Sequence, residues 1–147
     1  MFAESLGSNS RKVTTAIGIV VRFIEHINAR NVDALCGLMS EDHRFIDPLG
    51  AIVRGKAQVR QAWTGYFHMV PDYHISVEEM LEQHGVVVAL GTAGGTFSRT
   101  GELLEGNRWQ VAAAWRVEVS DNLVAEWKVY ADNEPLRRLM AGSVLST

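Results

Sequence analysis

The fold is decided by residues 73–131, which read YHISVEEMLEQHGVVVALGTAGGTFSRTGELLEGNRWQVAAAWRVEVSDNLVAEWKVYA. Runs rich in β-branched and aromatic residues alternate here with short segments of Gly, Asn, Asp and Ser, a pattern typical of strands joined by turns. Four strands are predicted, over Tyr73–Leu81, Val86–Phe97, Trp109–Val119 and Leu123–Ala131. Because consecutive strands usually pair with their neighbours, these strands predict an antiparallel meander.

Helical spacing dominates the residues upstream of that sheet. Apolar side chains recur every three to four positions in three segments, which predicts helices over residues 13–30, 32–39 and 56–70. Asn31 suits the N-cap of the second helix, and Pro71 ends the third. Two short strands, 43–47 and 51–54, lie around a turn at Pro48. We therefore expect an α+β fold, a cone-shaped roll in which three N-terminal helices pack on a curved, mainly antiparallel sheet around an apolar pocket.

The composition is that of an ordinary globular protein. Of 147 residues, 47% are hydrophobic and 21% are charged. This balance predicts one domain over residues 13–141, between a flexible tail of residues 1–12 and a second tail of residues 142–147. The net charge of −3 leaves no broad basic surface, which argues against nucleic acid as a partner. No apolar run reaches the ~18 residues that span a bilayer, so we expect no membrane partner and a cytoplasmic location.

No motif for a metal or a cofactor is found. The five histidines are scattered, and none shows the paired spacing of a metal site, so we expect no metal. The segment Gly91–Thr96 lies inside a predicted strand and precedes no helix, which indicates a bend or bulge and excludes a phosphate-binding loop. Cys36, the single cysteine, lies in an apolar run typical of buried packing. The sequence therefore predicts a protein that works without a cofactor.

The order of elements resembles the nuclear transport factor 2-like superfamily over nearly the whole chain, and its SnoaL-like and ketosteroid isomerase-like branch fits best. The stretches that carry the resemblance are FIEHIN at 23–28, NVDAL at 31–35, IDPLG at 46–50, VRGK at 53–56, VPD at 70–72 and EWKVYAD at 126–132. The resemblance implies a cone with one deep apolar pocket and, as is common in the superfamily, a dimer formed sheet to sheet.

Asp47 is the leading catalytic candidate. In ketosteroid isomerases, the aspartate of an Asp-Pro-hydrophobic-Gly segment is the general base that moves a proton beside a carbonyl, and Asp47 occupies that position. The superfamily's donors to the enolate oxygen are missing, because the matching positions hold Phe23 and Ala113. The alternative role of Asp47 is local, since Asp before Pro commonly opens a turn through side-chain to backbone bonds.

Asp132 is the second catalytic candidate. It resembles the aspartate that the limonene epoxide hydrolase branch carries on its last strand, although residues 89–96 hold neither the arginine nor the second aspartate of that branch. Asp132 could equally cap a short helix over residues 135–140, because Asp, Asn and Glu all suit a helix start.

The pocket is expected between the first helix, the third helix and the inner face of the sheet, with its mouth near Asp47. The residues predicted to line it are Phe23, Trp63, Tyr66, Val111, Ala113, Trp115 and Tyr130. The register of the last hairpin is open. A two-residue turn at Asp121-Asn122 places Lys128 and Tyr130 on the face of Trp115, whereas a shift of one residue places Trp127 and Val129 there.

Two functions fit these observations. The first is a cofactor-independent isomerase, cyclase or hydratase that acts on an apolar polyketide-, steroid- or terpenoid-like molecule, with Asp47 as general acid/base. The second is a non-catalytic small-molecule-binding or dimeric assembly module. In either case we expect a homodimer through the outer face of the sheet, where Ala112 and Ala114 allow close approach and Arg116 and Glu118 could pair across a twofold axis.

Overall fold

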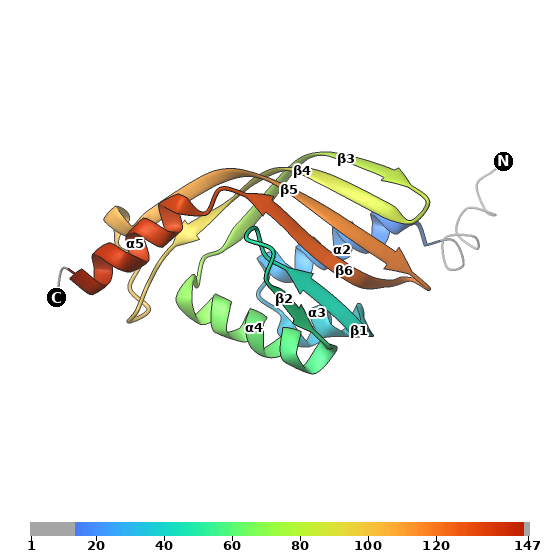
Figure 1. The fold of residues 1–147 in the computed structure, drawn as a ribbon, viewed down its shortest axis with the longest axis horizontal. Coiled ribbons are helices and arrows are strands. Elements are labelled where there is room, and N and C mark those ends of the chain that lie inside the picture. The colour runs from blue at the N-terminus through green and yellow to red at the C-terminus, as the bar shows by residue number, and fades with distance from the viewer. Residues whose placement is uncertain (1–13, 146–147) are drawn as a thin grey trace.

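The computed structural model describes residues 14–145 and shows a curved sheet with helices on one side (Figure 1). The expected tail of residues 1–12 lies outside this range. The strands are β1 (Met39–Ile46), β2 (Ile52–Arg54), β3 (His74–Gln83), β4 (Val86–Thr96), β5 (Arg108–Ser120) and β6 (Leu123–Ala131). The helices are α2 (Ala16–Asn28), α3 (Val32–Gly37), α4 (Lys56–Met69) and α5 (Glu134–Leu145), with a 3₁₀ turn η1 (Glu105–Asn107). The predicted α+β class is confirmed.

The first two helices begin at side-chain caps. Thr15 accepts a hydrogen bond from the Gly18 N–H at 2.9 Å, and Asn31 accepts one from the Ala34 N–H at 3.1 Å, as expected for the second helix. Helix α3 ends at Gly37, earlier than predicted, because Met39 already belongs to β1. The buried stripe of α2 consists of Ile19, Val20, Phe23, Ile24 and Ile27. It packs under the sheet and closes the core.

The sheet brings an early strand next to the last one. Its order is β2-β1-β6-β5-β4-β3, and the meander from β3 to β6 is antiparallel, as predicted. Strand β1 runs parallel to β6, with Phe45 opposite Trp127. Because Asp47 follows β1 directly, this pairing places it beside the end of β6. The position of Asp47 in the molecule therefore depends on the pairing of β1 with β6.

A bulge sets the register of the last hairpin. Asp121 and Asn122 take the left-handed conformations of a two-residue turn, with φ of 54° and 63°. The register then shifts between Glu118 and Val119, so that Trp115 lies opposite Val129. The second of the two registers is therefore the correct one. Tyr130, which was expected in the pocket, points to the outer face and is 49% exposed.

Strand β4 approaches its neighbours closely at its glycines. A Cβ atom at Gly91 would collide with the backbone carbonyl of Ser76 on β3, and one at Gly94 would collide with the carbonyl of Trp109 on β5. The register of β3 shifts between Val77 and Glu79, opposite Gly91 and Leu90, so the bulged residue lies on β3 and not within the Gly91–Thr96 segment, where a bend or bulge was expected. Small residues therefore let the sheet curve around the interior.

Helix α5 continues from β6 at one end of the sheet (Figure 1). It reaches Leu145, five residues beyond the predicted end at Met140, so the expected domain end at 141 falls inside a helix. Within residues 14–145, no helix is both long enough and apolar enough to cross a membrane.

Candidate functional site

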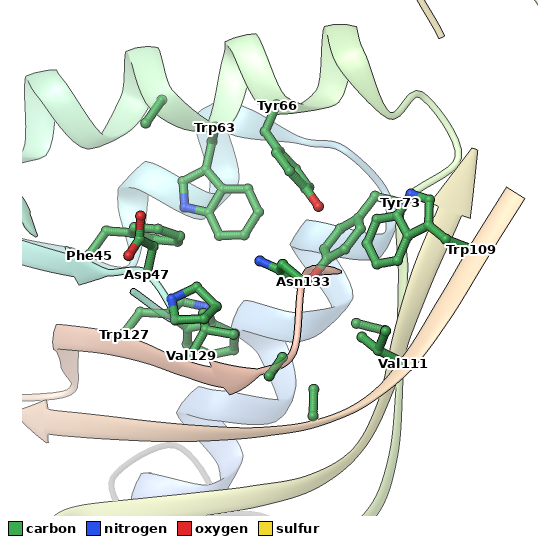
Figure 2. A pocket seen from close by; sticks show the side chains of 15 residues that line it. Phe45, Asp47, Trp63, Tyr66, Tyr73, Trp109, Val111, Trp127, Val129 and Asn133 are labelled. Atoms are coloured by element: carbon green, nitrogen blue, oxygen red, sulfur yellow. The ribbon is translucent and has the colours of Figure 1, made fainter. Parts of the chain in front are cut away.

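A cavity of about 290 Å³ lies between helix α4 and the inner face of the sheet. Figure 2 shows aromatic side chains around it, with Trp63 and Tyr66 descending from α4. Its lining residues are Phe45, Asp47, Pro48, Ala62, Trp63, Tyr66, Tyr73, Ala93, Trp109, Val111, Ala113, Trp127, Val129, Ala131 and Asn133. Asp47 is the only one of these residues with a charged side chain. The cavity is therefore an aromatic and aliphatic box with one carboxylate.

The structure brings five of the predicted site residues together and leaves four out. Asp47, Trp63, Tyr66, Val111 and Ala113 line the cavity. Phe23 and Trp115 are fully buried in the core instead, and the expected contribution of the first helix to the cavity wall is wrong. The reason is Trp127, which lines the cavity itself and separates it from Phe23, with ring centroids 4.9 Å apart.

Asp47 has both the cavity position and the turn role that the sequence left open. Its Oδ1 atom accepts hydrogen bonds from the backbone N–H groups of Leu49 at 2.9 Å and Ala51 at 3.0 Å. No residue within the described range donates a hydrogen bond to Oδ2 or forms an ion pair with the carboxylate. One oxygen therefore holds the turn, and the other remains available to a molecule in the cavity.

Asp132 lies outside the cavity, which corrects its assignment as a catalytic candidate. It is exposed, and its Oδ1 accepts a hydrogen bond from the backbone N–H of Glu134, the first residue of α5, at 3.0 Å. This is the helix-start role that competed with catalysis in the sequence. The next residue, Asn133, lines the cavity instead and supplies an amide that can donate and accept hydrogen bonds.

Two tyrosines add hydroxyl groups to the cavity wall. Tyr66 on α4 and Tyr73, just before β3, meet edge to face with ring centroids 5.0 Å apart. Burial raises the pKa of both phenols, and the nearby Tyr73 raises the pKa of Tyr66 a little further. Both side chains are therefore neutral at physiological pH, where each hydroxyl can donate a hydrogen bond.

The indole N–H groups of Trp63 and Trp109 are also part of this wall. Both are buried and have no hydrogen-bond partner in the structure. Buried donors of this kind usually find a partner, so these two unsatisfied N–H groups are exceptions in the packing around the cavity.

The sequence missed several wall residues for identifiable reasons. Trp109 shares the alternation of Val111 and Ala113 and could have been found from that pattern. Trp127 and Val129 required the correct hairpin register. Tyr73 lies between a helix and a strand, where no periodic signal assigns a direction to its side chain.

His43 is buried in the core, outside the cavity wall. Its Nδ1 lies 2.7 Å from the Val124 carbonyl oxygen, which makes it the donor, and its Nε2 has no partner. Burial lowers the pKa of His43, and the nearby Arg44 lowers it further, while the bond to Val124 opposes this. Among residues 14–145, no group of three or more His, Cys, Asp or Glu side chains is placed to hold a metal ion.

Comparison with known proteins adds a family and a set of similar folds. The model of the SnoaL-like domain family matches residues 20–127. A putative SnoaL-like polyketide cyclase from Shewanella putrefaciens CN-32 has a TM-score of 0.74 at 16% identity, covering 97% of this chain and 99% of its own. An LEH-like epoxide hydrolase from M. tuberculosis has a TM-score of 0.70 at 16% identity, covering 90% and 96%.

A further similar structure carries a ligand. A hypothetical protein with a ketosteroid isomerase-like fold from Catenulispora acidiphila DSM 44928, solved in complex with trimethylamine, has a TM-score of 0.71 at 16% identity, covering 84% of this chain and 92% of its own. No curated protein matches the sequence. At these identities the solved structures establish the shared fold.

Proposed function

The chain belongs to the SnoaL-like domain family, and from that premise we propose that it is a cofactor-independent enzyme acting on a small, mostly apolar organic molecule with Asp47 as general acid/base. The reaction is an isomerisation, cyclisation or hydration. The substrate is a polyketide-, steroid- or terpenoid-like compound. One observation carries the proposal: Asp47 presents an unpaired carboxylate oxygen on the wall of an aromatic cavity that has no other charge.

Acid/base chemistry suits this arrangement. A carboxylate held by two backbone N–H groups is fixed in position, and its second oxygen can take a proton from a molecule bound beside it. The surrounding aromatic groups exclude water and favour an apolar ligand. A similar fold binds trimethylamine, and others have names that describe them as a cyclase or an epoxide hydrolase, which supports a small molecule as the ligand here.

A non-catalytic binding or assembly module is the second candidate, and one observation favours it. The Oδ1 atom of Asp47 closes the turn before β2, so a structural role alone could account for an aspartate at this position. Substitution separates the two functions. In Asp47→Asn, the amide oxygen can keep both turn hydrogen bonds, while the titratable oxygen is lost.

We also propose a homodimer through the outer face of the sheet. A row of apolar side chains crosses this face from Leu90 on β4 through Ala114 on β5 to the exposed Tyr130 on β6. Such a row is typical of an association surface. Arg116 and Glu118, expected to pair across a twofold axis, pair with each other inside the chain at 2.7 Å. The apolar row, and not this ion pair, would carry the contact.

The experiment begins with ligand discovery. Native mass spectrometry of the purified protein should reveal a bound small molecule, and turnover of that chemical class should fall about 100-fold or more in Asp47→Asn. A folded Asp47→Asn variant with undiminished turnover would leave the turn as the sole role of this residue and would favour the binding module.

A further inference from the structure

The cavity carries a negative charge that no residue between 14 and 145 balances. Asp47 is the only charged residue in its wall, and the half-buried side chain forms no ion pair within that range. Arg44 on β1 and Lys56 at the start of α4 have other partners, Glu126 at 3.0 Å and Glu41 at 3.7 Å. Because a charge in an apolar wall is costly without a partner, this carboxylate favours a cation as ligand.

A row of aromatic rings lines the same cavity (Figure 2). Phe45 contacts Trp63, Trp63 contacts Tyr66, Tyr66 contacts Tyr73 and Tyr73 contacts Trp109, with ring centroids 5.6, 6.4, 5.0 and 6.3 Å apart in that order. Three of the four tryptophans of the chain belong to the cavity wall. The face of an aromatic ring attracts a cation, and tryptophan does so most strongly. The wall therefore suits a ligand that is both positively charged and largely apolar.

Three aromatic side chains lie at the carboxylate end of the cavity. Phe45 and Trp127 are partners in the pairing of β1 with β6, and Asp47 follows Phe45 by two residues. Figure 2 shows Asp47 next to Phe45, between Trp63 on α4 and Trp127 on β6. A cation interacts with a ring up to about 6 Å from its centroid, and the centroids of Phe45 and Trp63 are 5.6 Å apart. A cation beside Asp47 is therefore within reach of more than one ring.

The hydrogen-bond capacity of Asp47 indicates which kind of cation fits. Its Oδ1 atom already accepts the N–H groups of Leu49 and Ala51, so Oδ2 is the oxygen left for a ligand. A tertiary ammonium group has one N–H donor, and its carbon substituents can lie against the rings. A primary ammonium group has three donors and a guanidinium group has five, more than a mostly apolar wall can accept without cost. A volume of about 290 Å³ suits a skeleton of about two fused rings.

We propose that the cavity binds a small, lipophilic tertiary amine as its ammonium cation. The ammonium N–H donates a hydrogen bond to Oδ2 of Asp47, and the carbon substituents on nitrogen lie against Phe45, Trp63 and Trp127. This inference goes beyond the proposed function and shares only the cavity with it, because binding of the cation needs no proton transfer to carbon. The amine occupies the place of a neutral substrate and therefore inhibits the enzyme by competition.

The test compares two ligands of the same shape, 2-(dimethylamino)tetralin, which is a cation at pH 7, and 2-isopropyltetralin, in which carbon replaces the nitrogen. Titrations followed by tryptophan fluorescence should show that wild-type protein binds the amine at least about 10-fold more tightly than the hydrocarbon. Asp47→Asn should remove most of this preference, because the amide has no charge. Asp132→Asn makes the same change outside the cavity, at the helix cap, and should keep the wild-type preference.

A second variant tests the aromatic rings without changing Asp47. Phe45→Leu keeps an apolar side chain but removes a ring, so it should reduce the preference for the amine by about 2- to 5-fold. In proton NMR, the N-methyl resonance of the amine should move upfield on binding to wild type, because ring faces shield nearby protons, and this shift should shrink in Phe45→Leu.

Three results would overturn the inference: equal affinity of wild type for the two ligands, a wild-type preference in folded Asp47→Asn, or no binding of the amine. The comparison of the two ligands on wild type needs no variant to fold. It also needs no turnover, so the amine can fail to bind while Asp47 proves catalytic, or bind while Asp47 does not.

Discussion

Replacing Gly91 by alanine tests whether the close approach of β3 to β4 shapes the sheet. A Cβ atom at this position would meet the Ser76 carbonyl oxygen and lie 2.9 Å from the Ser76 carbonyl carbon and 3.0 Å from the Val77 Cα. All three atoms are backbone, so β3 must move away and strain its ladder. Overpacking of this kind costs about 1–3 kcal/mol, partly offset by the ~0.5 kcal/mol that alanine gains over glycine through the unfolded state.

Gly65→Ala is the matched control, because Gly65 lies inside α4 and an added Cβ has no neighbour within 4 Å. This variant should gain about 0.5–1 kcal/mol from helix propensity. The free energies of unfolding of the two variants should therefore differ by about 2 kcal/mol, measured by urea denaturation with circular dichroism. If Gly91→Ala proves as stable as Gly65→Ala, the close approach does not constrain the sheet and the reasoning fails.

Two further predictions concern the core and the outer face. Burial lowers the pKa of His43 below 6.5, the ordinary value that the unfolded chain keeps. Just below pH 6.5 the imidazole therefore takes up a proton only in the unfolded chain. The free energy of unfolding consequently decreases as the pH decreases, by up to about 1.4 kcal/mol per pH unit. Urea titrations from pH 7 to 5 should show a smaller pH dependence of the unfolding free energy in His43→Asn. His74→Asn, which changes an exposed histidine, should keep the wild-type dependence. An unreduced dependence in His43→Asn would show that His43 is not its source. The second prediction concerns the dimer through the outer face of the sheet. Light scattering should give about twice the 16.3 kDa chain mass for wild type and for the control Gln61→Arg on α4, and the monomer mass for Ala114→Arg on β5. A monomeric wild type would refute the dimer.

The fold was predictable because its signals are local. Helical spacing in α2, the cap at Asn31 and the turn at Asp121-Asn122 each specify structure within a few residues. The parallel pairing of β1 with β6 joins segments about 80 residues apart and leaves no such local signal. It was therefore seen only in the three-dimensional structure.

The site was predictable only in part, because a single bulge determines half of its wall. A slip of one residue between Glu118 and Val119 moves Tyr130 to the outer face and brings Trp127 and Val129 inside. Two aspartates with similar turn-forming signals also have different positions, since Asp47 follows β1 into the cavity wall and Asp132 caps α5 in solvent. The spacing of residues in the sequence identifies the candidate side chains but does not show to which side of the sheet each one points.

The central claim is that Asp47 transfers protons to and from a ligand in the cavity. Its most direct test uses 1-tetralone, a neutral two-ring ketone, as a probe. Proton NMR follows the incorporation of deuterium next to its carbonyl group in D₂O. Wild-type protein should accelerate this exchange, Asp47→Asn should lose about 100-fold or more of the acceleration, and Asp132→Asn, which changes only the helix cap, should match wild type. Equal exchange by wild type and a folded Asp47→Asn variant would contradict the account.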